Sequence, residues 1–428
     1  MKPISKKLKN GMQAITIPQK GAASMTAMVF VKVGSRYETM GINGASHFIE
    51  HLMFKGTKRR PTTLDISKEL DRYGAEYNAF TSKDLTAYYV KMDAEKTELA
   101  VDLLHDMLFH SKYDPKEMDR ERNVIVEEIN MYEDNPRMHI EDMLEEVLFP
   151  DSTLGWNIAG PREVIRTIPR KKLIDYRDAY YVPERITVVV AGKIQSNIWD
   201  ILEKTFGSVK APAKKADKTF APFTPPKKLK KKIVFQKKET EQVQLDIGFY
   251  GVSITDKERP AATLLASILG GTMSSRLFIQ VRERRGLCYS VNASHQSIED
   301  TGIFSVMSGL DKRRIKEATE VIWEELLKTT KTFVKSEELQ RAKDHIRGQL
   351  TLAFENSATI ANWFGKQGTF EGKLSTPEER LREIENVTAA DIRRVAKRIF
   401  RPELCAAAVI GPFENQKSVQ KFFPFLPT

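Results

Sequence analysis

Two histidines and a glutamate in the segment 47–51 strongly constrain how this chain can fold. The segment reads His-Phe-Ile-Glu-His. Because a helix turns by about 100° per residue, side chains three and four positions apart lie on one face. Two imidazoles at that spacing can share one zinc ion and leave Glu50 beside an open coordination position. The segment therefore predicts a helix that presents a metal site.

The flanking residues favour a short helix at this place. Residues 43–46 offer turn formers and possible N-caps, and Gly56 is a candidate C-cap. Phe48 and Leu52 give the helix an apolar face to bury. The competing interpretation is a helix with two incidental histidines, although the chain has only seven histidines in 428 residues.

A catalytic zinc site needs a third protein ligand and an open position for water. The segment 114–136, with a proline near each end, predicts a helix that can supply this ligand. Four of its residues share one face: Glu121, Val124, Ile125 and Glu128. A carboxylate on a core-facing stripe is costly unless it is paired or metal-bound. Glu128 is the better ligand candidate and Glu121 a supporting partner; alternatively, Glu127 and Glu128 are both solvated surface acids.

Three parts of the sequence together match one known pattern. They are HFIEH, a glutamate pair on a downstream helix, and the intervening segment YNAFTSKDLTAYY. In these parts, and over nearly its whole length, the chain resembles the inverted-zincin peptidases of the pitrilysin, insulysin and mitochondrial processing peptidase family. The separation of His51 and Glu128, 128 − 51 = 77 positions, also agrees with that family. No required position of the zinc motif departs from the pattern.

The resemblance implies a Zn²⁺ cofactor and a set of site residues. The implied zinc ligands are His47, His51 and Glu128. Glu50 is implied as the general base toward a zinc-bound water nucleophile, and Glu121 as an acid that orients one of the ligands. The implied substrate strand is Asn78, Ala79, Phe80 and Thr81. The expected activity is that of a zinc metalloendopeptidase or oligopeptidase acting on unstructured peptides or presequence-like segments.

The second half of the chain carries two further features. Gly270 and Gly271 follow an apolar segment and predict a tight, mobile loop, but no lysine follows as a phosphate loop would require. Arg282 and Tyr289 are seven positions apart. They are similar to the family's arginine–tyrosine pair, which holds the substrate carbonyl and the developing oxyanion. Without the resemblance, such a spacing is too common to indicate a function.

An internal repeat indicates two homologous domains. Pro183 precedes the apolar segment 188–192 and Pro402 precedes the segment 407–411, at an offset of 402 − 183 = 219 positions. We therefore expect an α/β (α+β) fold, in which each domain is a mixed, mainly antiparallel sheet covered by helices. The expected division is a catalytic zinc-binding domain over 1–209, a Lys/Pro-rich linker over 210–232 and a second domain over 233–428 without the zinc motif.

Charge and composition define the remaining function classes. The net charge of +11 raises the question of nucleic-acid binding. Much of the excess lies in 204–238 without any nucleic-acid motif, so we interpret it as a solvated linker and expect no nucleic-acid partner. The chain has no apolar run of about 18 residues, no signal-peptide core and only two cysteines, Cys288 and Cys405. We expect a cytoplasmic protein without a membrane partner.

The resemblance also implies how the chain assembles. Family members of double length carry four such units, with the zinc motif in the first and the arginine–tyrosine pair in the last. A chain with two units is therefore expected to form a homodimer in which Arg282 and Tyr289 complete the zinc site of the other subunit. The alternative is a non-catalytic structural subunit, since the fold also occurs in respiratory complexes. Such subunits usually lose part of the zinc motif, which is whole here.

Overall fold

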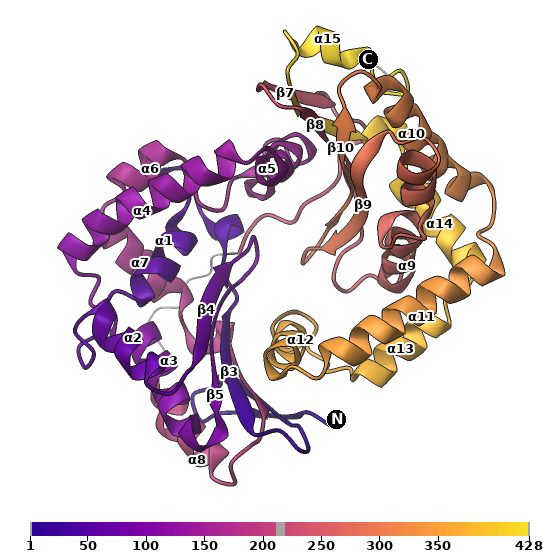
Figure 1. Ribbon diagram of the computed structural model, residues 1–428. Helices are drawn as coiled ribbons and strands as arrows, with labels where there is room; N and C mark the ends of the chain where they lie inside the picture. The colour runs from indigo at the N-terminus through magenta and orange to yellow at the C-terminus, as the bar shows by residue number, and fades with distance from the viewer. Residues whose placement is uncertain (1, 211–218, 427–428) are drawn as a thin grey trace. The chain divides into compact units, whose positions relative to one another are not determined.

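A computed structural model describes residues 2–210 and 219–426 of the chain (Figure 1). It divides into two compact units. The first unit comprises Met1–Asn130, Trp156–Phe220 and Leu350–Pro377, and the second comprises Met131–Gly155, Ala221–Gln349 and Glu378–Thr428. Each unit is a mixed sheet covered by helices, which confirms the predicted fold class.

The first unit is built on a six-stranded sheet in the order β1-β2-β6-β3-β5-β4. Its strands are β1 (Ile4–Lys7), β2 (Gln13–Pro18), β3 (Ser24–Val31), β4 (Glu76–Thr81), β5 (Thr86–Asp93) and β6 (Ile186–Gly192). Neighbouring strands are antiparallel except β2 and β6, which are parallel. Strands β3 and β6 are apolar along almost their whole length because both of their faces are buried. Strand β4 lies at one edge.

Helices cover both faces of this sheet. On one face the core includes residues of α1 (Ala45–Met53), α3 (Thr97–His110), α4 (Pro115–Asp134) and α7 (Arg170–Tyr180). On the other face, α12 (Ser357–Phe370) packs against β2, β3 and β6. At Gly365 of α12 an added Cβ would lie 1.9 Å from Cε2 of Phe30. Glycine is therefore required there by the close approach of the helix to the sheet.

The second unit has five strands in the order β7-β11-β8-β10-β9. They are β7 (Ile233–Lys237), β8 (Gln242–Tyr250), β9 (Cys288–Ser297), β10 (Gly302–Asp311) and β11 (Ala406–Gly411). The order and directions repeat those of β2-β6-β3-β5-β4, including one parallel pair, β7 with β11. Pro183 and Pro402 each begin a short 3₁₀ helix just before β6 and β11. The sequence repeat thus marks equivalent places in the two sheets.

One helix of each unit comes from the opposite half of the sequence. One face of the second sheet is covered by α9 (Arg259–Gly270), α10 (Ile315–Lys331) and α14 (Ala389–Ile399). The other face is covered by α5 (Pro136–Leu148), which packs against β8 and β11. The compact units therefore depart from the expected boundaries at 209 and 233 in two places, because α5 and α12 each find their apolar contacts on the sheet of the other half.

The expected linker over 210–232 is described only in part, since residues 211–218 lie outside the described residues. Residues 219–232 contain no helix or strand. They are nevertheless anchored: the Arg36 guanidinium lies 3.5 Å from the centroid of the Phe220 ring, and Leu229 is buried in the second unit.

The other helices are short or lie along the outside of the units. They are α2 (Thr63–Asp71), α6 (Arg162–Thr167), α8 (Ile198–Lys204), α11 (Ser336–Ala353), α13 (Pro377–Glu385) and α15 (Gln416–Gln420). Strand β1 is exposed throughout, and β7 directly follows a lysine run. The segment that carries Arg282 forms a π-helix, η7 (Phe278–Glu283).

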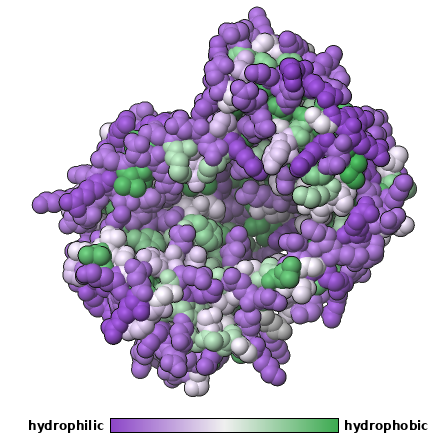
Figure 2. Space-filling model, viewed as in Figure 1, coloured by the Kyte–Doolittle hydropathy of each residue, from purple (hydrophilic) through white to green (hydrophobic). Residues whose placement is uncertain are grey.

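Hydrophilic residues cover most of the face of the molecule seen in Figure 2, and hydrophobic residues form small separate groups on it. Among the described residues, no helix is both long enough and apolar enough to cross a membrane.

Candidate metal centre

Helix α1 begins at a glycine and is held there by a buried carboxylate. Gly44, the N-cap, has a φ of 95°, and an added Cβ would lie 2.4 Å from the Ala159 carbonyl oxygen. The N–H groups of Gly44 and Ser46 donate to Oε2 and Oε1 of Glu38, each at 2.7 Å. Burial raises the pKa of Glu38, while these bonds and one from the Asn43 amide oppose the rise. Glu38 thus caps the helix from outside the motif.

The expected C-cap of this helix is wrong by two residues. The helix ends at Met53, with Phe54 as the C-cap. Gly56 adopts a φ of 107° in the turn beyond, where an added Cβ would meet the Pro61 carbonyl oxygen at 2.4 Å. The glycine serves this close approach of two backbone segments rather than the helix end.

Side-chain atoms of His47, His51 and Glu128 converge on one point. The two Nε2 atoms are 3.2 Å apart, and Glu128 Oε2 lies 3.3 Å from Nε2 of His51 and 3.6 Å from Nε2 of His47. Donor atoms about 2.0–2.1 Å from a tetrahedral zinc ion lie roughly 3.3–3.4 Å from one another. The three atoms therefore fit one face of a zinc coordination tetrahedron. Among the described residues, they form the one group of three that can hold a metal ion.

Helix α4 places its acidic residues in different surroundings. Glu121 and Ile125 are buried. The side chain of Glu128 is 27% exposed to solvent and contacts the two histidines. Glu127 is exposed, which separates the two neighbouring glutamates and removes the alternative in which both are surface acids. Val124 is 49% exposed, contrary to expectation. It lies at the margin of the stripe, and the neighbouring elements cover only the stripe's centre.

Glu121 orients His51 rather than His47. Its Oε1 lies 2.8 Å from His51 Nδ1, and its Oε2 lies 2.6 Å from Nζ of Lys55. In the neutral imidazole, which is the form that binds a metal, Nδ1–H donates to Glu121 and the lone pair of Nε2 faces the candidate metal position. The other imidazole differs: Nδ1 of His47 is buried and has no hydrogen-bond partner among the described residues.

The charged side chains around the candidate metal position shift one another's pKa values. Burial on its own would lower the pKa of His51, but the hydrogen bonds to Glu121 and Glu128 raise it to about 9. Hydrogen bonds from both histidines hold the pKa of Glu128 well below its usual range. Burial would raise the pKa of Glu121, yet its bonds to His51 and Lys55 lower it. Both carboxylates are therefore charged near neutral pH, as cation ligands and their supporting partners must be.

Glu50 lies on the same helix and contacts the edge strand. Thr81 Oγ1, at the end of β4, donates a hydrogen bond of 2.5 Å to Glu50 Oε2. Burial raises the pKa of Glu50, and the Thr81 bond opposes this rise. Among the described strands, β4 pairs with β5 alone, so its other edge can accept an extended chain. The contact between Thr81 and Glu50 was not expected, and no local spacing in the sequence indicates it.

Arg282 and Tyr289 lie side by side in the second unit. Cζ of Arg282 is 5.2 Å from the centroid of the Tyr289 ring and 4.7 Å from that of Phe278. Tyr289 belongs to the edge strand β9 and is 72% exposed. The structure thus brings the expected pair together on a surface of the second unit, whereas the histidine–glutamate group belongs to the first.

Comparison with known proteins defines the class to which this fold and site belong. Residues 14–162 match the family described as insulinase, peptidase family M16, and residues 167–346 match the peptidase M16 inactive domain. The zinc protease YmxG of Bacillus subtilis is 36% identical over 96% of this chain and 98% of its own length. A zinc protease of Rickettsia bellii is 34% identical over 95% of this chain and 97% of its own length.

The chain therefore belongs to peptidase family M16, which confirms the resemblance seen in the sequence. Its general activity is that of a zinc protease, and zinc is the metal that the histidine–glutamate group fits.

Solved structures share the fold. A protease from Helicobacter pylori has a TM-score of 0.89 at 23% identity and covers 96% of this chain and 99% of its own. A peptidase M16 inactive domain from Pseudomonas fluorescens has a TM-score of 0.87 at 18% identity and covers 97% of this chain and 100% of its own. A chain of Complex III2 from Candida albicans reaches 0.83 at 16% identity, covering 98% and 99%. At these identities the likeness concerns the fold alone.

Proposed function

We propose that this protein is a zinc metalloendopeptidase or oligopeptidase that hydrolyses unstructured peptides. His47, His51 and Glu128 are the metal ligands and Glu50 is the general base in this proposal. The observation that carries it is the triangle of donor atoms, with sides of 3.2, 3.3 and 3.6 Å, formed by Glu128 of α4 and by two histidines of α1, the helix that also carries Glu50. That spacing matches zinc coordination.

The chain's own residues divide the catalytic work. Zinc, when bound, supplies Lewis-acid chemistry and makes water nucleophilic near neutral pH. Glu50 accepts a proton from the attacking water and passes it to the leaving amine. Burial favours the protonated form of Glu50 between these two transfers, and Thr81 fixes the orientation of its carboxylate. Glu121 keeps the His51 proton on Nδ1.

The edge strand β4 defines the substrate class in this proposal. An extended peptide can add to its free edge through backbone hydrogen bonds, which do not depend on side chains. Asn78, Ala79, Phe80 and Thr81 form this strand edge. Because only an unpaired, extended segment can bind in this way, we expect flexible peptides to be cut and folded domains to be spared. Cleavage of a stably folded protein at an ordered internal site would refute this part.

Metal content and turnover together test the assignments. His51→Ala or Glu128→Gln should lose most of the zinc. Glu50→Gln should keep about one zinc per chain and lose turnover of a generic unstructured peptide. Glu127→Gln, a control that removes the same charge from an exposed neighbour, should change neither. A Glu50→Gln protein without zinc would show that Glu50 is a ligand and contradict the proposal.

We further propose a homodimer in which Arg282 and Tyr289 complete the zinc site of the other subunit. The support is that the chain carries both parts, and that Tyr289 is exposed rather than buried within its own unit. Opening and closing of the two subunits would admit peptides and assemble the site. A mixture of Glu50→Gln and Tyr289→Phe chains should regain partial activity after subunit exchange. If the mixture stays inactive although subunit exchange is demonstrated, the zinc group and the Arg282–Tyr289 pair of one site come from the same chain, and the shared-site model is wrong.

A further inference from the structure

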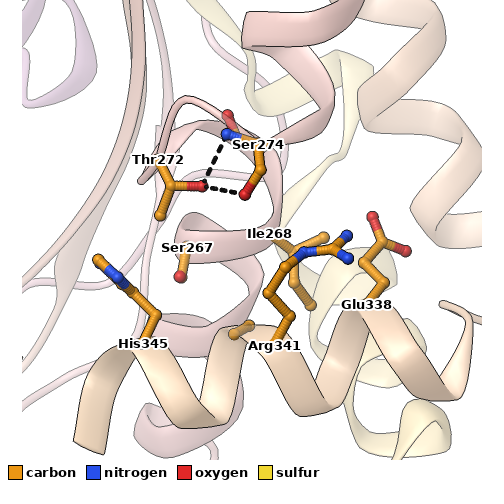
Figure 3. A pocket seen from close by; sticks show the side chains of 9 residues that line it. Ser267, Ile268, Thr272, Ser274, Glu338, Arg341 and His345 are labelled. Atoms are coloured by element: carbon orange, nitrogen blue, oxygen red, sulfur yellow. Dashed lines mark hydrogen bonds between the residues drawn. The ribbon is translucent and has the colours of Figure 1, made fainter. Parts of the chain in front are cut away.

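A small pocket in the second unit, lined by both polar and apolar side chains, lies apart from the residues discussed so far. It is a surface pocket between the end of α9, the loop 271–275 and helix α11 (Figure 3). Its volume is about 190 Å³. That is roughly six times the space of one water molecule in the liquid and below the range of about 300–1,000 Å³ for whole cofactors. The pocket therefore suits a small group rather than a nucleotide.

Hydroxyl groups line the side formed by α9 and the loop. They belong to Ser267, Thr272, Ser274 and Ser275. Ser275 is 3% exposed, and neither its Oγ nor that of Ser267 has a hydrogen-bond partner among the described residues. Both oxygens are closed off from solvent, so they lie behind the wall of the pocket and do not face a ligand. The hydroxyls of Thr272 and Ser274 share one hydrogen bond of 3.1 Å, which leaves one of their two protons free.

Basic side chains of α11 line the opposite side. Arg341 and His345 are four positions apart on this helix, and both line the pocket together with the hydroxyls (Figure 3). Among the residues that the structure describes, the ion pair of Arg341 is a weak one, at 3.7 Å, with Glu337, whose side chain is 89% exposed. The guanidinium is therefore available to a stronger anionic partner.

The one carboxylate in the lining is already neutralised. Both oxygens of Glu338 accept hydrogen bonds from Arg276, at 2.7 Å each. This bidentate pair removes the repulsion that a free carboxylate would exert on an anion. The groups left to bind a ligand are hydroxyl, guanidinium and imidazole donors.

We propose that this pocket binds a phosphate group, either inorganic phosphate or the phosphoryl end of a small phosphorylated compound. The number and spread of the donors match the several oxygens of a tetrahedral dianion better than the two coplanar oxygens of a carboxylate. The donors are side chains from two elements, so the site differs from the backbone cradle of a phosphate loop, which the sequence excludes here.

The test is titration calorimetry of the full chain with inorganic phosphate at constant ionic strength, with acetate as the comparison anion. We expect saturable binding of phosphate and at least about tenfold weaker binding of acetate. Arg341→Gln should weaken phosphate binding by about tenfold or more. Arg347→Gln, which removes the same charge from the same helix but pairs with Glu385 outside the pocket, should leave it within about twofold.

Ser274→Ala separates a binding role from a structural one. Removing this exposed lining hydroxyl should weaken phosphate binding by about threefold to tenfold and leave the melting temperature unchanged. The proposal is overturned if phosphate does not saturate, if acetate binds equally well, or if Arg341→Gln and Arg347→Gln have equal effects. A Ser274→Ala protein with a lower melting temperature and unchanged phosphate binding would also overturn it. Turnover of peptides is not used as a readout, so the result is independent of the proposed function.

Discussion

Oε1 of Glu121 lies 2.8 Å from Nδ1 of His51, and this contact decides which ring nitrogen faces the candidate metal position. Because Nδ1 carries the proton that Glu121 accepts, Nε2 is left as the lone-pair donor. The same carboxylate also binds Lys55 at 2.6 Å, so the orientation of His51 depends on a pair of charges.

Neutralising Glu121 should weaken zinc binding. In Glu121→Gln an amide oxygen still accepts the Nδ1–H bond but no longer strengthens the basicity of the ring. We expect zinc affinity, measured by competition with a chromogenic chelator, to fall by about 10–100-fold. Glu127→Gln on the same helix is the matched control and should bind zinc as the parent does. Equal affinity in all three proteins would mean that Glu121 has no part in the site.

Removing the Thr81 hydroxyl should lower turnover without removing the metal. Thr81→Val keeps the shape of the side chain but loses the bond to Glu50 Oε2. A hydrogen bond to a charged group is worth about 1.5–3 kcal/mol, so we expect kcat to fall about tenfold or more while KM and zinc content stay the same. Thr81→Ser should retain most of the activity. If Thr81→Val instead raises KM alone, the residue acts through substrate binding.

Two helical glycines should respond oppositely to alanine. Gly365→Ala places a methyl group 1.9 Å from the buried Phe30 ring and should destabilise the protein by about 1–3 kcal/mol. Gly348 of α11 has nothing within 4 Å of an added Cβ, so Gly348→Ala should stabilise it by up to about 1 kcal/mol. Urea unfolding measures both. A neutral Gly365→Ala would show that α12 does not pack against β3 as described.

Acid should destabilise the second unit through His295. Nε2 of His295 accepts the Val252 N–H at 3.1 Å, which only the neutral ring can do. Burial and the Arg259 guanidinium lower the pKa of His295 to about 4. From about 6.5, the unfolded value, down to about 4, the unfolded chain therefore binds more protons than the folded one. The unfolding free energy should fall across this window as pH falls, by at most about 3 kcal/mol.

Variant His295→Gln tests this linkage, because glutamine can accept the same N–H bond but does not titrate. Urea unfolding at several pH values between about 4 and 7 should show a smaller slope of unfolding free energy against pH in the variant than in the parent. Identical slopes would assign the acid sensitivity to other groups.

The sequence predicts those parts of the site whose geometry is local. The spacing of His47 and His51 follows from one helical turn, and Glu121 and Glu128 follow from two turns of another helix. Glu38 could not be found in this way. A usual capping box joins the N-cap to a residue inside the helix, whereas Glu38 lies six positions before the Gly44 cap and reaches it across a 3₁₀ turn.

The sequence does not predict which sheet α5 and α12 pack against. Alternation and helical spacing indicate where a strand or a helix forms and which of its faces is apolar. The apolar faces of α5 and α12 show that each helix needs a partner, but a hydrophobic stripe is equally suited to either sheet. Which sheet it covers depends on the path of the whole chain, and no local pattern carries that information.

The placement of α5 and α12 has a consequence for how the protein is made. While the chain leaves the ribosome, the apolar face of β2, β3 and β6 stays uncovered until α12 has been synthesised, which requires the chain up to Phe370. Conversely, α5 emerges long before β8 and β11, the strands that shield it. Nascent chains that stop near the midpoint therefore expose both the sheet face that α12 covers and the apolar face of α5, and they are candidates for chaperone binding. A gene cut at the midpoint would yield two fragments, each missing a helix that only the other supplies.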